Sequence, residues 1–126
     1  MNRDFHNEFA AATSLAPAAR TASANGTGID LAGYRTCAFV WNVGAITDGT
    51  HTPKIQDSDD NSSFSDVSAS FQSGTLAALT ANTNQECSYI GTKRYVRAVT
   101  TITGSPSTGG VYAALAVRGA PVTGPA

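Results

Sequence analysis

The stretch YRTCAFVWNV, residues 34–43, decides the fold class of this chain. Successive side chains of an extended strand point to opposite faces. One face of this stretch carries four apolar side chains: Cys37, Phe39, Trp41 and Val43. Ala38 and Val40 make the opposite face apolar as well. A strand that is apolar on both faces is typical of the centre of a sheet, so we expect Trp41 to be buried.

The rest of the chain consists of short segments with strand character, separated by turn residues. They are KIQDS (54–58), FSDVSASF (64–71), ECSYIG (86–91), KRYVRAVTTITG (93–104) and GGVYAALAVRGAP (109–121). In the last segment Val111, Ala113, Leu115 and Val117 alternate with Tyr112, Ala114, Ala116 and Arg118.

Turn residues between these segments suggest how the strands are connected. Asp48-Gly49 predicts a turn, and ITGSPSTGGVY (102–112) predicts a hairpin. GTLAALTA (74–81) fits either a strand or a short helical turn. About seven or eight short strands without helical periodicity between them predict an all-β fold, an antiparallel β-sandwich.

Residues 1–21 differ from this pattern and predict a separate N-terminal arm, followed by the sandwich over 22–126. NEFAAATSLA (7–16) fits about two helical turns, which Pro17 would end. The large apolar side chains of this arm are Phe5, Phe9 and Leu15, which are the candidate partner-binding residues. They either dock on a partner or pack back onto their own domain.

The acidic stretch QDSDDNSSFSDV, residues 56–67, resembles a calcium loop only in part. An EF-hand loop needs oxygen ligands at its first, third and fifth positions, Gly at the sixth and a bidentate acid at the twelfth. The first three fit: Asp57, Asp59 and Asn61. The sixth and twelfth positions are Ser62 and Ser68, so the motif fails where it must be rigid. We expect a solvated turn, no metal site and no cofactor.

No arrangement of residues in the sequence predicts catalysis. His6 and His51 lie in the arm and in a turn, where a solvated side chain is expected, and no nucleophile motif such as G-x-S-x-G is present. Cys37 and Cys87 lie in apolar or Thr-rich runs and predict small buried side chains. They can pair only if their strands are neighbours with suitable geometry. The chain is not expected to be an enzyme.

Charge and composition limit the kinds of partner that this chain is expected to bind. The net charge is −1 and 13% of the residues are charged, which argues against nucleic-acid binding. The N-terminal residues lack the apolar run of a signal peptide, and no stretch has the roughly 20 apolar residues of a membrane span. We therefore expect synthesis in a cytoplasm and no membrane partner.

The order of NVGAITDGTHTPKIQDSDD (42–60), FSDV (64–67), YIGTKRYVRAVTTITG (89–104) and GGVYAALAVRGAP (109–121) resembles a group of small structural proteins of tailed bacteriophages. These look like head decoration, or cement, proteins. The resemblance implies a virion protein of the phage head that binds the major capsid protein and neighbouring copies of itself. A tail or head–tail junction component and a carbohydrate-binding module are the alternatives; for the latter, Trp41, Tyr34, Tyr89 and Tyr112 are the available aromatic rings.

Overall fold

The structure is a computed structural model, and it describes residues 6–121. Its elements are η1 (His6–Glu8), β1 (Phe9–Arg20), β2 (Ala24–Asn25), β3 (Ile29–Asp30), β4 (Tyr34–Ile46), β5 (Thr50–Ser58), β6 (Ser65–Asp66), η2 (Ala69–Phe71), β7 (Gln72–Ser73), β8 (Asn84–Tyr89), β9 (Tyr95–Thr103) and β10 (Gly110–Pro121). No helix among these residues is long and apolar enough to cross a membrane.

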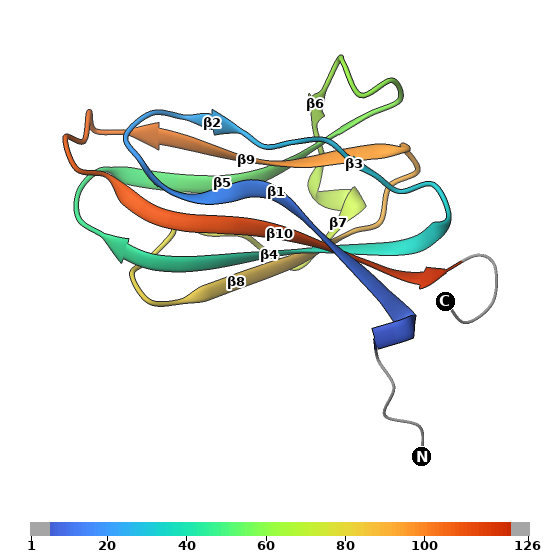
Figure 1. Cartoon of the computed structure of the whole chain (residues 1–126). Coiled ribbons are helices and arrows are strands. Elements are labelled where there is room, and N and C mark those ends of the chain that lie inside the picture. The colour runs from blue at the N-terminus through green and yellow to red at the C-terminus, as the bar shows by residue number, and fades with distance from the viewer. Residues whose placement is uncertain (1–5, 122–126) are drawn as a thin grey trace.

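The strands form two antiparallel sheets that pack face to face (Figure 1). The first sheet has the order β1-β10-β4-β8-β7. The second has the order β2-β9-β5-β6, and β3 also pairs with β9. The expected all-β antiparallel sandwich is therefore confirmed.

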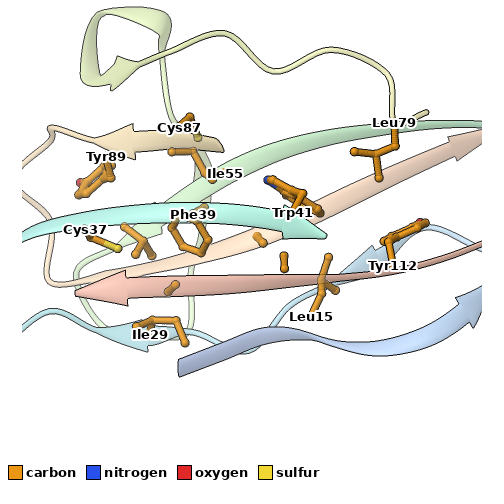
Figure 2. Packing of buried hydrophobic residues seen from close by; sticks show 14 of the residues in the cluster. Leu15, Ile29, Cys37, Phe39, Trp41, Ile55, Leu79, Cys87, Tyr89 and Tyr112 are labelled. Carbon is orange, nitrogen blue, oxygen red and sulfur yellow. The ribbon is translucent and has the colours of Figure 1, made fainter. Parts of the chain in front are cut away.

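β4 is a central strand, as residues 34–43 predicted. It lies between β10 and β8, and Trp41 is opposite Ala114 on one side and Gln85 on the other. The inward side chains of β4 meet those of β9, β5 and β8 in the core between the sheets (Figure 2). Trp41 and Phe39 are fully buried, so the expected burial of Trp41 is confirmed.

The N-terminal segment differs from the expected arm. Only His6–Glu8 are helical, in a 3-10 turn, and the chain then forms the 12-residue strand β1. β1 pairs with β10 from Phe9↔Gly119 to Arg20↔Gly110, so residues 9–20 belong to the sandwich and no boundary lies at residue 21. Pairing satisfies the backbone groups along the edge of β10, and this outweighs the helical preference of the alanines.

The connections correct one expectation and confirm another. ITGSPSTGGVY is not a hairpin, because β9 is in the second sheet and β10 is in the first. The turn at Asp48-Gly49 is confirmed, with Gly49 at φ +82°, and it too crosses between the sheets, from β4 to β5. The Asp48 carboxylate joins the two crossings, since it accepts N–H bonds from Ser107, Thr108 and Gly109.

Two further segments are less regular than expected. FSDVSASF forms only the short strand Ser65–Asp66 and the 3-10 turn Ala69–Phe71. GTLAALTA is neither a strand nor a helix, although Leu79 from it is buried in the core.

Candidate interaction surface

The outer face of the first sheet is uncharged and mostly apolar across β1, β10 and β4, and the exposed Glu86 of β8 borders it opposite Val40. We define this outer face by the outward positions of these strands: Ala11, Thr13, Thr36, Ala38, Val40, Asn42, Gly44, Val111, Ala113, Leu115 and Val117. Val111 is 44% exposed and Leu115 is 37% exposed, which is unusual for large aliphatic side chains near the middle of a sheet. A contiguous apolar patch of this kind marks an interaction site.

The register places the outward residues of the three strands side by side. Leu115 of β10 is opposite Thr13 of β1 and Val40 of β4, and Val117 is opposite Ala11 and Ala38. The side chains are short, so the face offers a broad surface rather than a deep pocket. A shallow hollow lies where Gly44 has no side chain, between Pro17 and Val111.

The outer face of the second sheet has a different character. Lys54 forms an ion pair with Asp66 at 3.0 Å, and Gln56 accepts two bonds from the Arg97 guanidinium. The same guanidinium lies over the Phe64 ring, 4.1 Å from its centroid. Polar groups on this face therefore bond one another, in contrast to the outer face of the first sheet.

The acidic stretch is a turn held by its own side chains, as expected. The Asp60 carboxylate accepts N–H bonds from Ser62 and Ser63 and a hydroxyl bond from Ser58. These donors, Ser63 first, lower the pKa of Asp60 to about 2. Asn61 follows at φ 60°, a conformation that Asn tolerates in turns. No group of three or more His, Cys, Asp or Glu side chains within residues 6–121 is arranged to hold a metal ion.

The other acids near this end of the sandwich bond nearby lysine, arginine and tyrosine side chains. Lys93 pairs with Asp59 at 2.9 Å, and Arg94 makes two bonds to Asp30. The Tyr89 hydroxyl donates to Asp57 at 2.8 Å. The pKa of Tyr89 is raised to about 12, mainly by burial and secondly by this bond to Asp57. These acids therefore make local ion pairs and hydrogen bonds. They do not form a pair of carboxylates that face each other across a cleft.

His51 is buried, which corrects the expectation of a solvated loop side chain. It lies inside β5, fully enclosed, with its Nε2 3.1 Å from the Asp48 carbonyl oxygen and its Nδ1 3.0 Å from the Tyr112 hydroxyl. A carbonyl can only accept, so in the neutral ring Nε2–H donates to Asp48 and Nδ1 accepts from Tyr112. The strand begins directly after the Asp48-Gly49 turn, and alternation with Pro53 and Ile55 is the signal that sequence reasoning missed.

The two cysteines are free and buried. Cys37 is opposite Tyr89 and Cys87 is opposite Phe39, so the thiols are diagonal neighbours on adjacent strands. Diagonal positions are about 7–8 Å apart, beyond the usual disulfide range. Burial raises the pKa of Cys37 to about 12 and that of Cys87 to about 11, which keeps both as thiols.

The three expected partner-binding residues do not form one surface. Leu15 is 2% exposed and packs in the core, so it is not available to a partner while β1 is folded. Phe9 is half-buried at the start of β1, and Phe5 lies outside the described residues. Sequence reasoning missed the outer face because it treated Val111 and Leu115 only as one side of an alternating strand.

The aromatic rings considered for a sugar platform are mostly internal. Trp41, Tyr89 and Tyr112 are buried in the core (Figure 2). Tyr34 is half-buried, and the Arg118 guanidinium lies 4.8 Å from its ring centroid. These rings do not present the adjacent open faces on which sugars stack.

Comparison with known proteins shows a likeness in fold but none in sequence. The sequence matches no known family and no curated protein. The fold is similar to the crystal structure of the SPBc2 prophage-derived protein YomS, with a TM-score of 0.56 over 90% of this chain and 94% of that chain. The sequences are 14% identical over this match. The chain thus shares its sandwich fold with a phage-derived protein.

Proposed function

We propose that this chain is a structural protein of a phage particle, a head decoration protein that binds the major capsid protein through the outer face. The observation that carries the proposal is the uncharged apolar surface around Val111 and Leu115. The sandwich shared with a prophage-derived protein supports a phage origin. The resemblance of residues 42–60 and 89–104 to phage head proteins supports a place in the particle.

The outer face suits attachment to a lattice. Its side chains are short and are fixed on paired strands, so little conformational entropy is lost on binding. A shell presents many equivalent sites, and modest contacts repeated over many copies can strengthen it. Burial of a Val or Leu side chain contributes about 1.5–3 kcal/mol, enough for specific binding when several contribute.

The test is binding to shells assembled from the major capsid protein of the same phage. Leu115→Asp places a charge in the outer face and should weaken binding by about tenfold or more, because the charge would lose its water on docking. Phe71→Asp is the matched control: Phe71 is 51% exposed but lies in η2, outside the outer face. Co-sedimentation with shells measures both, and thermal melting checks that each variant is folded.

Two results would count against the proposal. If Leu115→Asp binds shells as well as the wild-type chain does, the outer face is not the surface that contacts the capsid. Failure of the wild-type chain to bind shells, together with its presence on tails in electron micrographs of labelled particles, would favour the tail or head–tail junction instead.

A further inference from the structure

The first half of β1 has an open backbone edge. β1 is the terminal strand of the first sheet, and Ala10–Thr13 pair with Arg118, Val117, Ala116 and Leu115 of β10 on one side. Among residues 6–121, no backbone group outside β10 is bonded to the backbone of this segment. Figure 1 shows this part of β1 running away from the strands of the second sheet towards η1. Its outer N–H and C=O groups are therefore available to another strand.

The second half of β1 is closed by contrast. The Ser14 carbonyl accepts the Thr27 N–H at 2.7 Å, and the Ser14 hydroxyl donates to the Thr27 carbonyl and accepts the Ala98 N–H. Register shifts follow on both sides of Leu15, and Pro17 has no N–H to offer. These features tie β1 to the second sheet and prevent strand addition beyond Thr13.

Two other long strand edges in the described part of the chain are covered. β8 is flanked by β7 at Tyr89 and Ser88, and farther along the Gln85 side chain bonds the backbone of Ala77. β5 is flanked by β6, and backbone bonds from Val67 and Leu79 cover more of its edge. The open segment of β1 stands out against this pattern.

We propose that Ala10–Thr13 pair antiparallel with the same segment of a second copy of this chain. An antiparallel pair of identical strands has two-fold symmetry, so each copy satisfies the other with the same groups. Residues 9–19 contain no charged side chain, so nothing repels the second copy. The alanines are small enough for close approach. The two first sheets then join into one, and the two outer faces become continuous.

This inference goes beyond the capsid proposal, because the pairing is a property of the isolated chain. The short segment makes few bonds, and we expect a weak dimer that forms as the concentration rises. Ala11 is itself one of the residues of the outer face, so Ala11→Lys tests the pairing and Leu115→Asp tests shell binding. A wild-type chain that stays monomeric yet binds shells contradicts this inference alone, which keeps the two failures distinguishable.

The test uses sedimentation velocity over a concentration series. Ala11→Lys places like charges beside each other across the two-fold axis and should weaken dimerisation by about tenfold or more. Ala19→Lys is the matched control, since Ala19 is an exposed alanine in the same strand but beyond Pro17. Hydrogen exchange should show that Ala10–Thr13 gain protection with concentration while the wild-type chain dimerises.

Three outcomes would overturn the proposal. A wild-type chain that stays monomeric at the highest soluble concentration shows that the edge does not pair. A dimer that survives Ala11→Lys, with both variants melting like wild type, places the contact elsewhere. Dissociation by Val111→Lys, with Ala11→Lys still dimeric, shows that copies associate through their outer faces.

Discussion

Trp41 has its whole side chain inside the sandwich, yet its indole Nε1–H has no hydrogen-bond acceptor among the residues that the structure describes. A buried donor without a partner costs roughly 1–3 kcal/mol of stability. The large apolar ring offsets that cost by filling the space between β4, Leu79 and Tyr112 (Figure 2). The two contributions can be separated by substitution.

Trp41→Phe should cost much less stability than Trp41→Ala. The phenylalanine ring keeps most of the packing and removes the unpaired N–H, whereas alanine leaves a cavity and should cost about 3–5 kcal/mol. Urea unfolding curves of both variants measure the difference. Since Trp41 is the single tryptophan, wild-type fluorescence should also be blue-shifted and resist iodide quenching. Equal losses for the two variants would mean that the N–H is satisfied by a bound water.

Asp30, at the end of β3, is held by three hydrogen bonds. The Arg94 guanidinium bonds both of its oxygens, and the Ala32 N–H adds a third bond. The Arg94 hydrogen bonds are the main cause that lowers the pKa of Asp30 to about 2. The unfolded value is about 4, so the folded state favours the charged carboxylate.

A depressed folded pKa contributes stability above the unfolded pKa, and that stability is lost as the pH falls from about 4 towards about 2. The stability difference between wild type and Asp30→Asn should therefore be present at neutral pH and vanish in this acid range. The difference is small, because the Asp30 and Arg94 side chains are 43% and 56% exposed. Urea midpoints across the range measure it. Arg94→Gln should remove the same pH dependence, and a difference that grows with acidity would contradict this account.

At the scale of elements, β1 closes one side of the sandwich. Leu15 fills the core from β1, and Ser14 bonds Thr27 and Ala98 across to the second sheet. Gly26 lies so close to this contact that a Cβ there would overlap Ser14 Oγ and the Ala98 carbonyl oxygen. β1 is thus built into both sheets.

Removal of residues 1–20 should abolish cooperative unfolding, because it exposes the edge of β10 and opens the core. Leu15→Ala should destabilise the chain by about 2–5 kcal/mol while keeping the fold. Circular dichroism melting measures both. Ala16→Ser, at an exposed position of the same strand, should melt like wild type. A truncated chain that unfolds at the wild-type temperature would restore the separate arm.

The alternating strands could be predicted from the sequence and β1 could not. Residues 34–43 carry β-branched and aromatic side chains, and the alternation of these side chains predicts which of them are buried. Half of the β1 residues are alanine, which fits a helix or a strand, and pairing with the distant strand β10 decides between them. Turn residues likewise predict where the chain bends but not which sheet it enters next, so the β9–β10 connection resembled a hairpin.

The candidate surface was only partly foreseeable. The outward alternation of Val111 and Leu115 is visible in the sequence, but nothing there shows that the side chains remain uncovered. Leu15 shows the reverse case, because an apolar residue in a segment of mostly small side chains fills the core. Only the arrangement of the two sheets shows which apolar side chains are exposed and which are buried.

At the scale of the whole molecule, the two sheets have different outer surfaces. One is apolar, around Leu115, and the other is tied together by the Lys54–Asp66 pair and the Gln56–Arg97 bonds. A domain with one apolar and one polar outer face would bind a surface in a single orientation, through the apolar face. On a shell it would leave the hydrated side facing outward.

The position of β10 has a consequence for biosynthesis. It is the last of the described strands along the chain, yet it lies between β1 and β4. Until it emerges, the nascent chain holds two strands that have no common neighbour, and the core around Trp41 stays open on that side. Pairings between segments so distant in the chain form slowly. The sandwich therefore closes only once β10 is available, so a chain cut before Gly110 lacks the strand that joins β1 to β4 and has no stable core.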